Sequence, residues 1–180
     1  MDEQTDQIST DQAGARRSGV AGSLRASGDR ATVRMQDRYP THPEDLWAAV
    51  TEPERLARWI AVVDGVPGLG GTVHARFTSG WEGDVRVEVC EPPRRLIVTS
   101  APGRSDETTI EAVLTRDGDS TLLVVEERGI SLEQVAAYGA GWQAHIEDLA
   151  AHLAGRDAGG WATRWTELAP AYAEQAHSLA

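Results

Sequence analysis

The apolar residues of this chain repeat with one period in its middle and another near its end, and this change limits the folds open to it. From Ser131 to about residue 154 they recur every three or four positions, which predicts one long helix. Before it they form short runs separated by turn sequences, which predicts strands near 72–78, 83–91, 95–100, 108–116 and 121–128. Because the connections between these strands are short, we expect an antiparallel meander.

The segment ahead of the meander adds a strand and two short helices. Residues 31–35 alternate apolar and polar side chains, as in a half-buried strand. Pro43 suits the first turn of a helix, and we interpret residues 51–54, Thr-Glu-Pro-Glu, as a capping box that begins a second one. Together these elements describe an α+β fold, in which a curved antiparallel sheet wraps around a long C-terminal helix, with two short helices after the first strand.

The composition divides the chain into a tail and one domain. Residues 1–28 are mostly small and polar, so they cannot bury enough apolar surface to offset the entropy of ordering, and we predict a disordered tail. Residues 29–180 have the size of a single domain. Within it, the long helix should span about 131–154, and the segment 156–180 should pack back as a short helix.

The charged residues exclude several classes of function. The net charge is −11, all 17 cations are arginine, and neither lysine nor asparagine occurs, which removes lysine chemistry and phosphate-loop sites. An acidic chain repels phosphate backbones, so we expect neither nucleic acid nor a membrane as a partner. A single cysteine, Cys90, and the lack of an apolar run of about 18 residues favour a cytoplasmic location.

Several phrases carry a resemblance to a known family. They are Arg38-Tyr-Pro-Thr-His-Pro-Glu-Asp-Leu-Trp47, Val50-Thr-Glu-Pro-Glu54, Leu56-Ala-Arg-Trp59, Glu91-Pro-Pro-Arg-Arg-Leu96 and Gly141-Trp142. In this order and spacing, over about residues 30–155, the chain resembles the SRPBCC (START-like) superfamily, within it the homologues of the heat-shock-protein-90 ATPase activator. The resemblance implies a helix-grip fold with a deep, largely apolar cavity between sheet and helix, while activity varies among members.

The cavity that the resemblance implies should be lined by apolar side chains of the predicted strands and helices. Trp81 follows a turn glycine at a strand edge and could overhang the cavity mouth, whereas His145 adjoins the apolar stripe of the long helix and either orients a ligand or lies at the boundary beside Asp148. The residues we assign to the ligand cavity are Trp59, Phe77, Trp81, Val85, Val98, Trp142, His145, Ile146 and Leu149.

The pattern of polar residues identifies no catalytic or metal site. His145 and His152 are too far apart along one helix to share a zinc ion, and no nucleophile motif or cofactor signature occurs. Glu111 is expected on the outer face of its strand. One of Glu126 and Glu127 should lie at the cavity mouth, and we assign neither as catalytic.

The leading functional interpretation is a binding protein for a hydrophobic or polycyclic small molecule, acting as a monomer or weak homodimer without a cofactor. The superfamily also includes cyclase-type enzymes, and co-chaperone activity is a further alternative. A third alternative comes from members that bind a reactive enediyne antibiotic and are sacrificed by cleavage at a glycine. Gly80, Gly83 and Gly129, near the expected cavity rim, are the candidates for such cleavage.

Overall fold

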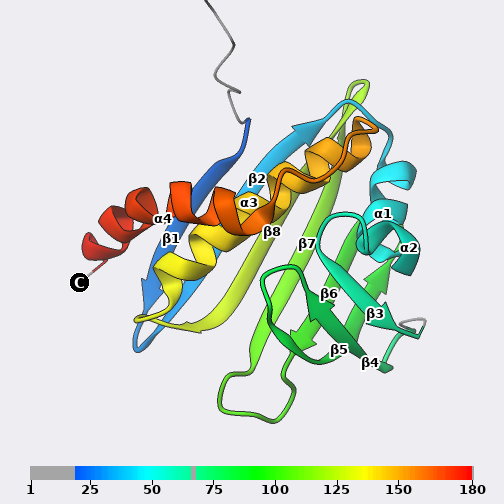
Figure 1. Cartoon of the computed structure of the whole chain (residues 1–180). Coiled ribbons are helices and arrows are strands. Elements are labelled where there is room, and N and C mark those ends of the chain that lie inside the picture. The colour runs from blue at the N-terminus through cyan, green and yellow to red at the C-terminus, as the bar shows by residue number, and fades with distance from the viewer. Residues whose placement is uncertain (1–18, 66–67, 180) are drawn as a thin grey trace, which may run out of the picture.

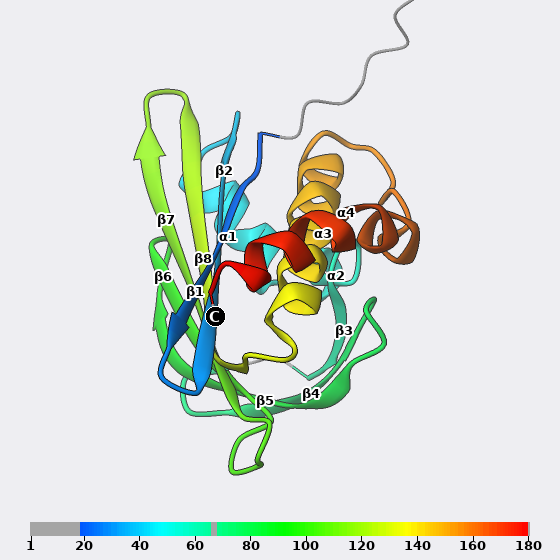
Figure 2. The same ribbon diagram turned by 90° about the vertical axis from the view of Figure 1, so that its left-hand side faces the viewer.

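The computed structural model describes residues 19–65 and 68–179, in which one open antiparallel sheet curls around a helix (Figures 1 and 2). Its strands are β1 (Ala21–Ser27), β2 (Arg30–Tyr39), β3 (Ala61–Asp64), β4 (Thr72–Phe77), β5 (Glu82–Glu91), β6 (Arg95–Ser100), β7 (Thr108–Asp117) and β8 (Ser120–Ser131). Its helices are α1 (Pro43–Thr51), α2 (Pro53–Leu56), α3 (Val135–Leu153) and α4 (Trp161–His177). The predicted α+β helix-grip fold is confirmed.

The order of the strands explains the curvature around the helix. It is β1-β2-β8-β7-β6-β5-β4-β3, and every neighbouring pair is antiparallel, so the predicted meander is present from β3 to β8. Figure 2 shows β1, β2, β8 and β7 on one side of α3, β5 beneath it and β3 on the other side. The sheet therefore surrounds α3 on three sides and provides the walls of a concave volume.

Helix α4 packs closely against α3 because two glycines of α3 leave room for aromatic rings. A Cβ atom at Gly139 would lie 2.4 Å from Cδ1 of Tyr172, and one at Gly141 would lie 3.2 Å from Cζ2 of Trp161. The Tyr172 hydroxyl also donates a hydrogen bond to Oε1 of Gln143 at 2.8 Å. These contacts, which involve both the first turn and the second half of α4, hold α4 across the first half of α3 (Figure 1).

The prediction of a disordered N-terminal tail is wrong for the residues that form strand β1. Residues 21–27, assigned to a disordered tail ending at residue 28, pair with residues 30–36 of β2. A strand this poor in apolar side chains is ordered because β2 satisfies its backbone hydrogen bonds and Leu24 is buried beside Gly139. The rest of the predicted tail, residues 1–18, lies outside the described residues.

Three further details correct the sequence predictions. The capping box is absent: Thr51 closes α1 by donating to the carbonyl of Trp47 at 2.7 Å, and Glu52, the residue before α2, makes no side-chain cap. Strand β3 is only four residues long and was not predicted. Strand β8 continues to Ser131, so α3 begins at Val135 instead of Ser131, and the C-terminal segment forms a helix of 17 residues.

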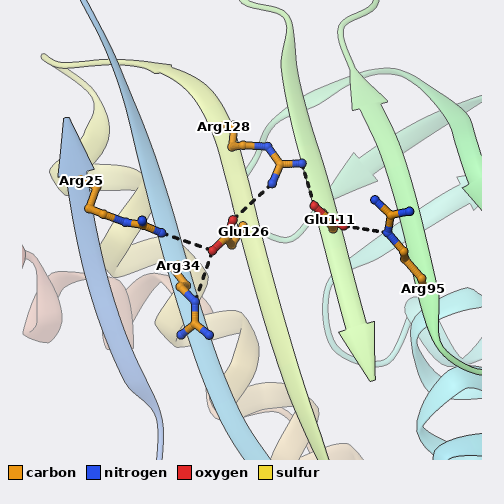
Figure 3. A network of polar contacts seen from close by, with 6 residues as sticks. All are labelled: Arg25, Arg34, Arg95, Glu111, Glu126 and Arg128. Carbon is orange, nitrogen blue, oxygen red and sulfur yellow. Dashed lines mark hydrogen bonds and ion pairs between the residues drawn. The ribbon is translucent and has the colours of Figure 1, made fainter. Parts of the chain in front are cut away.

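The outer face of the sheet carries a network of ion pairs (Figure 3). It runs across five neighbouring strands in the order Arg25, Arg34, Glu126, Arg128, Glu111 and Arg95. Glu111 accepts from Nε of Arg95 and from Nη2 of Arg128, both at 2.8 Å, and the bond to Arg95 is the largest cause that lowers the pKa of Glu111. The predicted outward orientation of Glu111 is confirmed, and the charged groups of this network lie on the face of the sheet away from α3.

Candidate functional site

Two adjoining cavities lie between the sheet and the helices. The first, which we call the aromatic pocket, has a volume of about 290 Å³ and is lined by Phe77, Ser79, Trp81, Ser100, Ile110, Glu127, Ala137, Tyr138, Gly141, Trp142, His145, Trp161 and Trp165. The second, the apolar pocket, has a volume of about 160 Å³ and is lined mainly by aliphatic side chains, among them Val73, Val85, Val87, Val98 and Val125. Phe77, Ile110 and Trp142 line both, so these three side chains form the boundary between the two pockets.

The wall of the aromatic pocket is a chain of rings in mutual contact. The ring of Phe77 meets that of Trp81 edge-on, with centroids 5.3 Å apart. His145 lies at the centre, 6.1 Å from the ring of Trp142 and 5.5 Å from that of Trp161. Trp161 in turn stacks on Trp165. The β4–β5 turn, α3 and α4 thus contribute one continuous aromatic surface, the kind of surface on which planar apolar molecules stack.

His145 is an inward-facing residue of this pocket and not a boundary residue. Its side chain is 5% exposed, and Nδ1 lies 3.4 Å from Oγ1 of Thr78. Burial disfavours the imidazolium and lowers the pKa of His145 to about 4, so the ring is neutral near pH 7. The neutral imidazole therefore gives the pocket a polar group that carries no charge.

Glu127 is the carboxyl group of the aromatic pocket. Its side chain is 5% exposed, Oε1 accepts from the Thr108 hydroxyl at 2.6 Å, and Oε2 accepts from the indole N–H of Trp142 at 2.5 Å. Burial raises the pKa of Glu127, while the two hydrogen bonds act in the opposite direction. The structure therefore distinguishes the two neighbouring glutamates, since Glu126 lies in the outer network and Glu127 faces inward.

The structure places most of the predicted cavity residues on the two pockets. Trp81 and His145 line the aromatic pocket, whereas Trp59, Val85 and Val98 line the apolar one. Ile146 and Leu149 line neither: they are 1% and 0% exposed and belong to the packed core beneath α3. Our assignment of these two to the cavity is therefore wrong, because an apolar stripe on a helix does not reveal where packing leaves space.

Three aromatic residues of the site were missed in the sequence. Tyr138 lies on α3, and Trp161 and Trp165 lie at the start of α4, all with side chains on the aromatic pocket. The indole N–H of Trp161 donates to the carbonyl of Gly141 at 3.1 Å, which fixes α4 against α3 at this point. The sequence feature that could have indicated these residues is the pair of glycines at 139 and 141, because glycines in a helix mark where another segment can approach it closely.

The three candidate cleavage glycines lie outside the linings of both pockets. Gly80 has φ +87° in the β4–β5 turn, next to the pocket residue Ser79. A Cβ atom at Gly83 would lie 3.0 Å from the Trp81 ring. Gly129 has φ +91° at the register shift between β2 and β8. Backbone geometry or close packing therefore accounts for each glycine.

Within residues 19–65 and 68–179, no three His, Cys, Asp or Glu side chains gather closely enough to hold a metal ion. No helix in the same ranges has the length and apolar character needed to cross a membrane.

Comparison with known proteins agrees with the fold. A family model described as "Activator of Hsp90 ATPase homolog 1-like protein" matches residues 40–154. Among curated proteins, none matches this chain in sequence. CalU16 from Micromonospora echinospora, known from a crystal structure, is 23% identical in sequence to this chain. Its structure matches with a TM-score of 0.74, over 89% of this chain and 99% of CalU16. This likeness shows the fold alone.

Two further structures are somewhat more similar in sequence. DynU16, described as a protein of the dynemicin biosynthetic locus, is 28% identical with a TM-score of 0.65, over 71% of this chain and 49% of that one. This chain therefore spans about half the length of DynU16. MLL2253 from Mesorhizobium loti is 28% identical with a TM-score of 0.62, over 70% of this chain and 98% of that one.

Proposed function

The chain belongs to the activator of Hsp90 ATPase homolog 1-like family, and we propose that this member binds a hydrophobic, polycyclic small molecule in the aromatic pocket. The observation that carries the proposal is the continuous ring surface from Phe77 to Trp165 around a cavity of about 290 Å³. Small-molecule sites are mostly apolar, have a few convergent polar groups and begin at about 300 Å³. Glu127 and His145 are the polar groups here.

The apolar pocket behind the boundary extends the proposed site. Phe77, Ile110 and Trp142 separate it from the aromatic pocket, and we expect Phe77, whose side chain has no hydrogen bond to lose, to change rotamer when a ligand arrives. A ligand longer than the aromatic pocket would then reach the aliphatic side chains of β4, β5 and β6. We expect the rings of a ligand to stack in the aromatic pocket and an aliphatic part to enter the apolar pocket.

A second candidate is sequestration of an antibiotic, and the similarity to DynU16 favours it. DynU16 is described as a protein of the dynemicin biosynthetic locus, and it is 28% identical to this chain. In this function the pocket would hold a reactive polycyclic molecule, and the backbone at Gly80, next to the pocket residue Ser79, would be a cleavage point beside the pocket. Cleavage into two fragments that requires the reactive ligand distinguishes this function from plain binding.

A titration with polycyclic compounds tests the proposed function. A ligand stacked among these rings should quench tryptophan fluorescence saturably, with one site, and raise the melting temperature. Trp81→Ala should weaken binding by about 1–2 kcal/mol, because Trp81 contributes a ring to the pocket from an exposed turn. Val62→Ala is the control, since Val62 is exposed and lines neither pocket. A broad panel that gives neither quenching nor a thermal shift contradicts the proposal and directs attention to protein partners.

A further inference from the structure

Glu127 is a buried carboxyl group whose ionised form has no cationic partner in the described lining of the aromatic pocket. Of the described residues that line this pocket, Glu127 is the one carboxyl group, and no arginine is among them. Glu127 also takes part in none of the ion pairs found within residues 19–65 and 68–179. A buried carboxylate without a cationic partner is costly, and a ligand can supply the missing charge.

The carboxyl group retains capacity for a further hydrogen bond. An ionised carboxylate offers about four acceptor positions. Thr108 uses one position on Oε1 and Trp142 one on Oε2. The two remaining positions allow a ligand donor to be added without displacing either protein donor.

None of the described groups around Glu127 carries a positive charge near pH 7. On β7, the Thr108 hydroxyl donates a hydrogen bond to the Glu127 carboxyl group, and Ile110 is apolar. On α3, the indole N–H of Trp142 donates to the same carboxyl group. The pKa of Tyr138, also on α3, is raised by burial and then by the charges of Glu127 and Asp106. His145 is neutral near pH 7 and brings no competing cation. Two hydrogen bonds stabilise the ionised carboxylate of Glu127 in part, but no cation among the described lining residues balances its charge.

The rings of the pocket add a second attraction for the same kind of group. The faces of tryptophan, tyrosine and phenylalanine attract cations through their quadrupoles, and tryptophan does so most strongly. Four of the six tryptophans of the chain, Trp81, Trp142, Trp161 and Trp165, line this pocket. Aromatic faces and one buried carboxylate together form a site for an organic ammonium group.

We propose that the natural ligand of the aromatic pocket carries a basic amine, whose ammonium group binds Glu127 while its apolar skeleton stacks on the surrounding tryptophans. This inference rests on the proposed function, since it names the chemical class of the ligand for the same site. It predicts that the protein discriminates by charge between molecules of the same shape.

Matched probes of one skeleton test the inference. Anthracenylmethylamine, anthracenylmethanol and anthracenecarboxylate differ at one substituent, and each accepts energy from excited tryptophan, so binding is read as quenching at pH 7. We expect the amine to bind at least about tenfold more tightly than the alcohol, and the carboxylate to bind most weakly, since one charged hydrogen bond exceeds a neutral one by about that factor. The preference should persist at high salt, because a buried pair is screened little.

Glu127→Gln is the decisive variant, because an amide can still accept from Trp142 and donate to Thr108. It should lose the preference for the amine over the alcohol, and this ratio of affinities, not the affinity for either probe alone, is the readout. Glu91→Gln is the matched control, since Glu91 is exposed at the end of β5 and its loss changes the net charge by the same amount. A preference that persists in Glu127→Gln, or that salt abolishes, overturns the inference and assigns the effect to surface charge.

The wild type alone provides a second measurement, independent of how the variant folds. The ammonium group binds the ionised carboxylate, and the pKa of Glu127 is raised in the free protein, so binding should release a proton and tighten as pH rises through that pKa. Affinity for the alcohol should not change in this way. Equal binding of amine and alcohol at every pH overturns the ammonium inference but leaves the proposed function intact, whereas failure of all three probes contradicts both.

Discussion

The indole N–H of Trp142 donates to Oε2 of Glu127 at 2.5 Å, so the side chain that separates the two pockets is held by the carboxyl group of the larger one. The hydrogen bond links helix α3 to strand β8 through the interior. Thr108 on β7 holds the other oxygen of the same carboxyl group. Packing between helix and sheet and the polarity of the pocket therefore depend on the same three residues.

Replacement of Trp142 should separate its packing from its hydrogen bond. Trp142→Ala should lower the free energy of unfolding by about 3–5 kcal/mol, because it removes a large buried ring. Trp142→Phe keeps much of the ring but leaves Oε2 of Glu127 without its donor, which should cost about 1–3 kcal/mol. Urea unfolding measures both. A loss under about 0.5 kcal/mol for the alanine variant, the size of an ordinary surface change, would mean that this face of α3 is not buried.

Glu127→Gln should change how stability depends on pH. The pKa of Glu127 is raised by burial above its ordinary 4.5, so its contribution is fully present below that value and is lost as pH rises through the raised pKa. The variant has no such loss, and its stability relative to the wild type should increase with pH over this window. A stability difference that is constant from pH 4 to pH 8 would show that Glu127 titrates as an ordinary exposed carboxyl group.

His145→Phe should show the opposite dependence. The pKa of His145 is lowered from 6.5 to about 4, so the contribution of the neutral ring is present above 6.5 and lost as pH falls toward 4. Over that range the wild type should lose up to about 3 kcal/mol relative to the variant. The exposed His177→Phe serves as the control. Parallel pH profiles for the wild type and His145→Phe would contradict the buried, uncharged state of this imidazole.

Removal of strand β1 by truncation should lower the stability of the protein. A chain that begins at residue 29 loses β1 and the burial of Leu24, whereas one that begins at residue 19 keeps both. Burial of one leucine contributes about 1.5–3 kcal/mol, which corresponds to a melting temperature lower by about 4 °C or more for the shorter chain. Equal melting temperatures for the two truncated chains, measured by calorimetry, would contradict a contribution of β1 to stability.

Sequence alone predicted the elements whose signals are local. Turn residues such as Pro102-Gly103 and Asp117-Gly118 separate the strands, and the period of α3 runs through Trp142 and Leu149, so the meander and the long helix were foreseen. Strand β1 was missed because its order comes from pairing with β2, which composition does not register. Helix α4 was foreseen as a helical segment, but its length was underestimated.

The site was predicted less completely because a cavity is defined by what packing leaves empty. Of the residues assigned to the cavity, Trp81 and His145 line the aromatic pocket. Ile146 and Leu149, on the same helix as His145, pack into the core. The inward orientation of Glu127 follows from strand alternation, since it continues the inward face of Leu123 and Val125. The contribution of α4 could not be read from periodicity, which does not say against which neighbour a helix packs.

The most direct test of the central claim uses the tryptophan side chains as site reporters. In a two-dimensional ¹H–¹⁵N spectrum of the labelled protein, each of the six indole N–H groups gives one signal. Titration with anthracenylmethylamine should shift the signals of Trp81, Trp142, Trp161 and Trp165, which line the aromatic pocket, and leave that of Trp47, which lines neither pocket, in place. If the four signals stay fixed at saturating probe, or if only Trp47 responds, the aromatic pocket is not a ligand site.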